Sequence, residues 1–169
     1  MKIFIEEYNA EWKDKFREEK ERIAKSLSGI TFHIEHIGST SIDGLGAKPI
    51  IDILIGLEDF SIANLQINKL AALGYQYLNQ YEDVMPYRRF FIKQTAGIST
   101  FHIHMVQINS EFWNRHLAFR NYLRNNPTEK MEYYLLKKEL AQRDWNDVNE
   151  YANAKTEFIK RIERKALSD

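Results

Sequence analysis

The hydrophobic positions of this chain follow strand and helix periods in turn up to about residue 110, and the helical period alone after it. The run over 50–57 is nearly all apolar, as expected for a strand that is covered on both faces. In order, the first part predicts a helix over 9–28, a strand over 32–37, a strand over 50–57 and a helix over 62–73 that ends at Gly74.

Three further strands are predicted before the helical part begins. They cover 75–78, 88–93 and 100–107, with a loop over 80–86 and a hairpin turn over 95–97. Beyond them the pattern predicts a helix opened by Ser110, a second helix starting at Pro127 or Thr128, and a last helix over about 148–166. The sequence therefore predicts one α/β (α+β) domain over 1–169 with a helical C-terminal third.

Composition narrows the function classes. The 24 basic and 24 acidic residues leave no formal net charge, which argues against broad electrostatic capture of nucleic acid and leaves a local basic site open. The absence of cysteine excludes disulfides, thiolate catalysis and cysteine-based zinc sites. No apolar run suggests a signal peptide or a membrane span, so we expect a cytoplasmic protein that does not bind membranes.

The most informative segment is Gly38-Ser39-Thr40-Ser41, between the predicted strands over 32–37 and 50–57. Glycine lets a ligand approach the backbone, and hydroxyls with free N–H groups at a helix start suit a phosphate. Taken alone, the segment is better explained by an ordinary helix cap. The nearby Lys48 and Asp52 favour the phosphate-binding interpretation.

Asp52 is the one charged residue in an apolar run, and a buried carboxylate needs a partner. It is predicted to bind Mg²⁺ or Mn²⁺, or to pair with an arginine or lysine. The alternative is a structural aspartate that caps a neighbouring turn.

These motifs resemble the GrpB-like family, within the nucleotidyltransferase superfamily of the DNA polymerase beta type. Ile37-Gly38-Ser39 and Asp52-Ile53 match the superfamily signature. The segments that match the family more widely are His102-Ile103-His104, the run over 115–120, Tyr151 and Ala154-Lys155-Thr156. The resemblance implies a nucleotidyltransferase-like mixed β-sheet packed by helices, and a site that binds a nucleotide and a divalent metal.

Leu54 departs from that signature. Residues 52 and 54 share one strand face, and the resembled enzymes hold metal ions there with paired acids. Leucine cannot bind a metal, so two-metal chemistry requires another side chain or is absent.

His102 and His104 are the candidates for compensation. They lie on one face of a predicted strand, roughly 7 Å apart, and with Asp52 could bind one ion. Two histidines and a carboxylate suit Mn, Fe or Zn better than Mg. The alternative is a pair of histidines that form hydrogen bonds within the sheet.

Basic residues elsewhere could contact phosphate. Of Arg88 and Arg89 only one can face the site, and an edge-strand role that discourages aggregation is an equal alternative. Tyr151 and Lys155 could lie at a pocket edge, although a helix-surface pair is favoured.

Three other features carry weaker expectations. The family resemblance makes His36 a candidate for orienting the site. The spacing of His116 and Arg120 alone predicts a solvent-exposed pair on one helix face. The charged runs over 13–25 and 137–143 are interpreted as solvent-facing helix surfaces.

Three functions compete on this evidence. The first, favoured as a class, is a metal-dependent nucleotidyltransferase with Asp52 and His104 as catalytic candidates. The second is a non-catalytic protein that binds a nucleotide or phosphorylated small molecule. The third is a different metal-dependent enzyme built on His102, His104 and Asp52.

Overall fold

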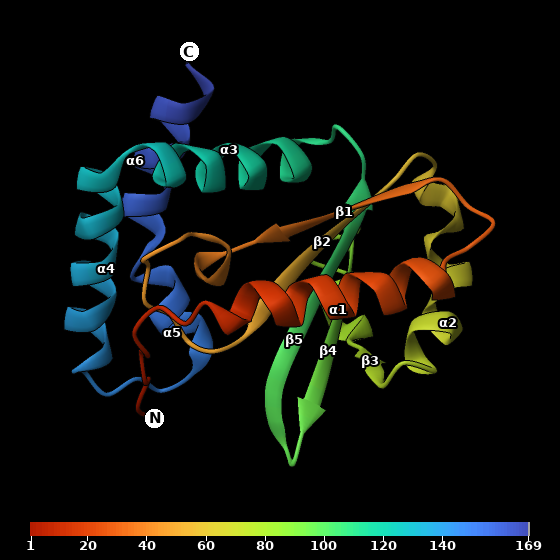
Figure 1. The fold of residues 1–169 in the computed structure, drawn as a ribbon, viewed down its shortest axis with the longest axis horizontal. Coiled ribbons are helices and arrows are strands. Elements are labelled where there is room, and N and C mark those ends of the chain that lie inside the picture. The colour runs from red at the N-terminus through yellow and green to blue at the C-terminus, as the bar shows by residue number, and fades with distance from the viewer. Residues whose placement is uncertain (169) are drawn as a thin grey trace.

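A computed structural model describes residues 1–168, in which five strands form one sheet with helices on both faces (Figure 1). The strands are β1 (Phe32–Ile37), β2 (Ile51–Leu57), β3 (Tyr75–Tyr77), β4 (Arg88–Thr95) and β5 (Ile98–Gln107). The α-helices are α1 (Glu11–Ser26), α2 (Ile67–Ala71), α3 (Glu111–Asn125), α4 (Pro127–Ala141), α5 (Val148–Asn153) and α6 (Thr156–Leu167). The predicted α/β chain with a helical C-terminal third is confirmed.

The strands are ordered β1-β2-β5-β4-β3. β2 and β5 run parallel, and the other neighbouring pairs are antiparallel, which confirms the mixed sheet. The apolar run of β2 is explained by its inner position, because its side chains pack alternately against the two helical layers. No helix within residues 1–168 is long and apolar enough to cross a membrane.

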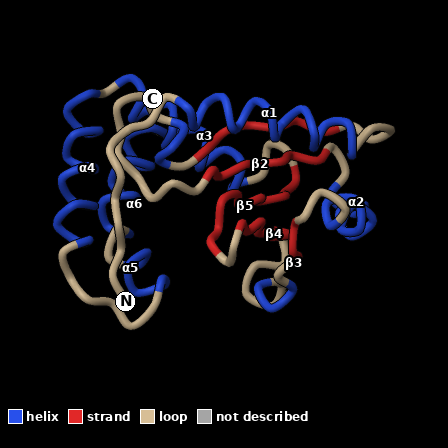
Figure 2. The backbone as a smooth tube through the Cα atoms, turned by 60° about the horizontal axis from the view of Figure 1, so that its bottom comes forward, coloured by secondary structure: helices blue, strands red, loops and turns tan. Residues whose placement is uncertain are grey.

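Helices cover the two sheet faces unequally. α1 lies along one face, where Trp12 and Ile23 pack on Ile53, Ile55 and other core residues (Figure 2). The opposite face meets α3 through a smaller cluster of Ile37, Leu54, Val106, Phe112 and Trp113. The helices α4, α5 and α6 gather at one end of the molecule, beside the sheet (Figure 2). This arrangement brings the C-terminal third against the turn that follows β1.

Two predicted helices differ from the observed elements. The helix over 62–73 is α-helical only in α2, because the preceding 3₁₀ segment Phe60–Gln66 is held by Asp59, which caps it through the Ser61 N–H. The predicted last helix is two helices, α5 and α6, since the chain turns at Ala154 and Lys155, where Lys155 N–H bonds the Ala152 carbonyl. The break places Lys155 at the start of α6.

The predicted solvent faces each contain one buried charge. Glu19 of α1 is buried, where it accepts hydrogen bonds from the Tyr75 hydroxyl at 2.9 Å and from Lys93 Nζ at 2.8 Å. Lys137 of α4 is 2% exposed. The prediction that these runs face solvent is therefore wrong at Glu19 and Lys137, although most of their other charged residues are exposed.

Candidate functional site

The turn after β1 has the backbone that the Gly-Ser motif predicts. Gly38 has φ 74° and ψ −177°, a conformation that residues with a side chain rarely adopt. Ser39–Ser41 then form one 3₁₀ turn, in which the Ser41 hydroxyl donates to the Gly38 carbonyl. Ser41 therefore stabilises the turn itself, whereas Ser39 and Thr40 line a cavity beside it.

His36 supports this turn from the strand side. The Thr40 hydroxyl donates to the Ile50 carbonyl, so the 2.9 Å contact between His36 Nε2 and Thr40 Oγ1 has the imidazole as donor. Burial lowers the pKa of His36 to about 4, and the ring stacks on Phe16 with centroids 4.6 Å apart. The expected orienting role is therefore performed by a neutral, buried histidine.

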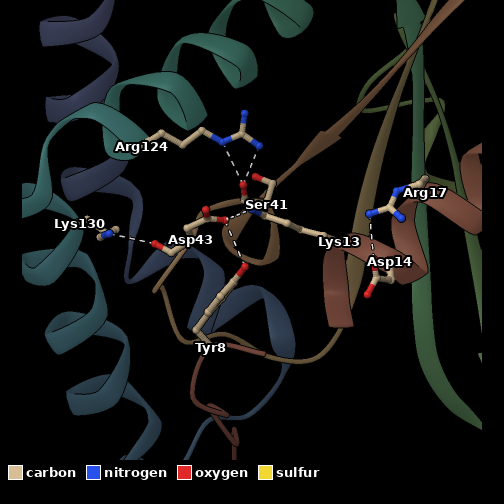
Figure 3. Close-up of polar contacts among 8 residues, drawn as sticks. All are labelled: Tyr8, Lys13, Asp14, Arg17, Ser41, Asp43, Arg124 and Lys130. Carbon is tan, nitrogen blue, oxygen red and sulfur yellow. Dashed lines mark hydrogen bonds and ion pairs between the residues drawn. The ribbon is translucent and has the colours of Figure 1, made fainter. Parts of the chain in front are cut away.

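Cationic side chains from the C-terminal helices hold the carbonyls of the segment over 36–46. Figure 3 shows two of them, Arg124 on the Ser41 carbonyl at 2.7 and 3.0 Å, and Lys130 on the Asp43 carbonyl at 2.9 Å. The full set pairs Arg120 with His36, Arg124 with Ser41, Lys130 with Asp43 and Lys137 with Gly46. Arg120 also pairs with Glu35 at 2.6 Å, so it is not the solvated residue that its spacing suggested.

The carboxylate of Asp52 lies beside this turn. In the sheet Asp52 pairs with Ile37 on one side and His102 on the other. Its Oδ1 lies 3.4 Å from His104 Nε2 and 3.7 Å from His102 Nδ1, and its side chain is 30% exposed. Burial would raise the pKa of Asp52, but the hydrogen bond from His104 and the nearby positive charges hold that pKa below its usual value.

Arg88 fixes the tautomer of His104. Its Nη1 lies 3.3 Å from His104 Nδ1, and a guanidinium can only donate, so Nδ1 accepts and Nε2 carries the proton. The proton on Nε2 therefore points to Asp52 in a chain from Arg88 through His104 to the carboxylate. Arg89 is not part of the site, because it lies on the opposite face, where it bonds Asn64 and Glu82.

The cavity beside the turn has a volume of about 160 Å³ and is rich in lysine. Lys48, Lys137 and Lys155 line it together with Asp52. Among residues 1–168 none of the three lysines forms an ion pair with a carboxylate. Lys48 and Lys155 instead lie 5.3 and 4.6 Å from the Tyr151 ring centroid. We call this space the lysine cavity.

Burial shifts the titration of these lysines. It lowers the pKa of Lys137 to about 7, together with the nearby charges of Lys155 and Lys48. It also lowers the pKa of Lys155 to about 8, which the Asp52 carboxylate partly opposes. Asp52 is the one carboxylate that lines the cavity with these three lysines, so the cavity is short of negative charge when they are protonated and favours an anion.

Tyr151 completes the wall of the lysine cavity. It is 1% exposed, and its hydroxyl has no hydrogen-bond partner within the described chain. The favoured interpretation of Tyr151 and Lys155 as a helix-surface pair was wrong, since the break between α5 and α6 turns both inward. A buried hydroxyl without a partner is costly, and a bound ligand would satisfy it.

Sequence reasoning missed Lys137 as a site residue. Its position carries a signal nevertheless, because Tyr133, Lys137 and Leu140 form the buried stripe of α4 at helical spacing. A lysine within an apolar stripe indicates a buried ammonium group.

The predicted metal ligands are only partly assembled. Asp52, His102 and His104 lie close together, yet no group of three His, Asp or Glu side chains between residues 1 and 168 has the arrangement of a metal site. Leu54, at the position of the second acid, is fully buried against Phe112 and Trp113. These residues do not fit a two-metal centre.

Comparison with solved structures shows which fold the chain has. The chain superimposes on the Cid1 poly(U) polymerase with a TM-score of 0.55 at 17% identity, over 83% of this chain and 44% of that one. A cytoplasmic RNA terminal U-transferase gives a TM-score of 0.53 at 18% identity, over 80% and 42%. The chain thus has a nucleotidyltransferase-like fold.

Within that class the chain belongs to the GrpB family, whose model, described as GrpB protein, matches residues 2–165. The crystal structure of GrpB from Enterococcus faecalis is 38% identical with a TM-score of 0.88, over 98% of both chains. The protein YqkA of Bacillus subtilis is 38% identical over 98% of this chain, which spans only 47% of its length. The glutamate-rich protein GrpB of Alkalihalophilus pseudofirmus is 34% identical, over 95% of this chain and 93% of that protein.

Proposed function

We propose that this protein binds a nucleotide or a related phosphorylated small molecule, with its phosphate groups in the lysine cavity. The observation that carries the proposal is the convergence of Lys48, Lys137 and Lys155 on one cavity without a matching set of carboxylates. The unpartnered Tyr151 hydroxyl supports the same conclusion, because a phosphate oxygen would accept its hydrogen bond.

In this proposal the lysines neutralise phosphate charge, as metal ions do in the enzymes of this fold class. Ammonium groups in a partly dry cavity neutralise phosphate charge strongly, since the local dielectric is low. Asp52 is exposed enough to contact one Mg²⁺ that enters with the ligand, as Mg²⁺ is often bound by one carboxylate and substrate phosphates. Such an ion would add further neutralisation of the phosphates.

Binding without transfer is favoured over nucleotidyl transfer. Transfer by two metal ions needs paired carboxylates, and Leu54 leaves only Asp52 on that strand face. The hydrogen bond from His104 also occupies Oδ1 of Asp52 in the described arrangement, which leaves Oδ2 for at most one ion. Nucleotidyl transfer is the second proposal, and the likeness of the fold to that of the transferases supports it.

Calorimetry with inorganic pyrophosphate and with ATP, each with and without Mg²⁺, tests the proposal. We expect wild type to bind, and Lys155→Met to bind pyrophosphate at least about tenfold more weakly, since a charge-assisted hydrogen bond is lost. Lys160→Met is the matched control, because Lys160 lies on the same helix, is exposed, and does not line the lysine cavity. If neither probe binds wild type under any condition, the proposal fails.

A labelled-nucleotide incubation separates binding from transfer. Wild type and Asp52→Asn would be incubated with ATP labelled on the α-phosphate, and the products separated by chromatography. Unchanged ATP with proven binding supports the binding protein. A labelled product in which AMP is joined to an acceptor other than water, with release of pyrophosphate, formed by wild type and not by Asp52→Asn, would establish transfer instead.

A further inference from the structure

A second cavity, of about 400 Å³, adjoins the lysine cavity. The two share three lining residues, Ser39, Asp52 and Lys155. The first volume suits a compact head group, whereas the second lies in the range of pockets that hold organic molecules. One ligand that passes Asp52 could therefore occupy both.

The second cavity has a different chemistry from the first. Phe119 and Tyr133 supply aromatic walls, and Ile37 and Ile159 supply aliphatic ones. Of the three lysines of the first cavity, only Lys155 reaches it. It therefore suits an uncharged, ring-bearing group better than a further phosphate.

Two polar side chains that line the second cavity and not the lysine cavity, His116 and Glu163, offer hydrogen-bond acceptors. His116 Nδ1 lies 2.8 Å from the Phe112 carbonyl, which cannot donate, so Nδ1 carries the proton and Nε2 is left as an acceptor. Glu163 adds a carboxylate that is 18% exposed and pairs with Arg115 at 3.5 Å. A ligand group with N–H or O–H donors would match these two side chains.

We infer that the second cavity holds the nucleoside part of the ligand, with its base between the aromatic and aliphatic walls and its amino or hydroxyl groups facing His116 and Glu163. This inference rests on the proposed function, because it assumes that the phosphates of the same ligand occupy the lysine cavity. It adds that the protein selects a nucleotide over a bare polyphosphate.

The test compares ATP with inorganic triphosphate on wild type and on Ala152→Phe. Ala152 is exposed and lines only the second cavity, so phenylalanine there would fill the space without removing a core side chain. We expect wild type to bind ATP at least roughly tenfold more tightly than triphosphate, the effect of one well-packed ring. In Ala152→Phe that preference should vanish while triphosphate affinity is unchanged.

Two further variants serve as controls for this test. Ala154→Phe adds the same bulk two residues further along the chain, at an exposed position that lines neither cavity, and should keep the preference for ATP. Ile159→Ala removes a wall and should weaken ATP alone. Equal binding of ATP and triphosphate by wild type, or a preference that survives Ala152→Phe, would overturn the inference and leave the lysine cavity intact. Failure of both probes on wild type would remove both proposals.

Discussion

Gly38 lies against the carboxylate of Asp52 so closely that a Cβ atom on Gly38 would be 2.7 Å from Asp52 Oδ2. The contact is closer than real Cβ atoms allow, so the turn and the acid fit together only while residue 38 is glycine. The backbone of Gly38 adds a second requirement, because its φ of 74° is strained for other residues.

Gly38→Ala is therefore expected to lower the free energy of unfolding by about 2–4 kcal/mol, from strain at a glycine conformation together with the clash. Urea unfolding would measure the loss. Gly97→Ala is the control for strain alone, since Gly97 has a φ of 79° and nothing within 4 Å of the new Cβ. In a double-mutant cycle, Asp52→Ala should relieve part of the cost of Gly38→Ala. Strict additivity would contradict the contact.

Lys137 should make the stability of the protein rise with pH above neutrality. Its pKa is about 7 in the folded chain against 10.5 for a free lysine, so between these values the unfolded chain binds the extra proton. The stability of wild type relative to Lys137→Met should thus increase from pH 7 to pH 9, by up to about 1.4 kcal/mol per pH unit. Urea unfolding at three pH values measures this slope. Parallel curves for the two proteins would show that Lys137 titrates normally.

Arg88 and Arg89 provide a matched pair, because neighbouring residues of β4 point to opposite faces. Nitrogen-resolved NMR of the histidine rings should find His104 with its proton on Nε2 in wild type and in Arg89→Met. In Arg88→Met the Nδ1 resonance of His104 should shift, since Nδ1 loses its donor, while the Nε2 proton stays bonded to Asp52. A His104 spectrum unchanged by Arg88→Met would exclude the proposed chain of hydrogen bonds.

Restoring the second acid should not restore a metal centre. Leu54 is fully buried against Phe112 and Trp113, so Leu54→Asp would bury a charge without a partner. We expect it to cost more than Leu54→Ala, for which about 2–5 kcal/mol is typical. Thermal unfolding with and without Mn²⁺ is the measurement. Rescue of Leu54→Asp by Mn²⁺ would show instead that α3 moves aside and that the site can become a two-metal one.

The local part of the site could be predicted from the sequence. Gly38 directly follows β1, and Asp52 lies in β2, which pairs with β1 and is the next strand of the chain, so their proximity follows from strand pairing and a turn glycine. The alternation of β4 likewise showed that only one of Arg88 and Arg89 could face the site. The Gly-Ser turn and its acid are thus encoded within one short stretch of chain.

The lysine cavity could not be predicted in the same way. Lys48, Lys137 and Lys155 lie on separate elements, and only the packing of the C-terminal helices brings them together. The break between α5 and α6 decides the direction of Lys155, while the pattern over 148–166 is that of a single helix. Burial of Lys137 and Glu19 likewise depends on partners far along the chain, which periodicity within one helix does not contain.

The hydrogen bonds to the four carbonyls of the segment over 36–46 also constrain the order in which parts of the protein can fold during synthesis. Their donors come from α3 and α4, between 83 and 91 residues later in the chain. During synthesis, β1 and its turn leave the ribosome several seconds before those helices do. The turn therefore lacks these hydrogen bonds until α3 and α4 have been made, and the candidate site forms only after those helices.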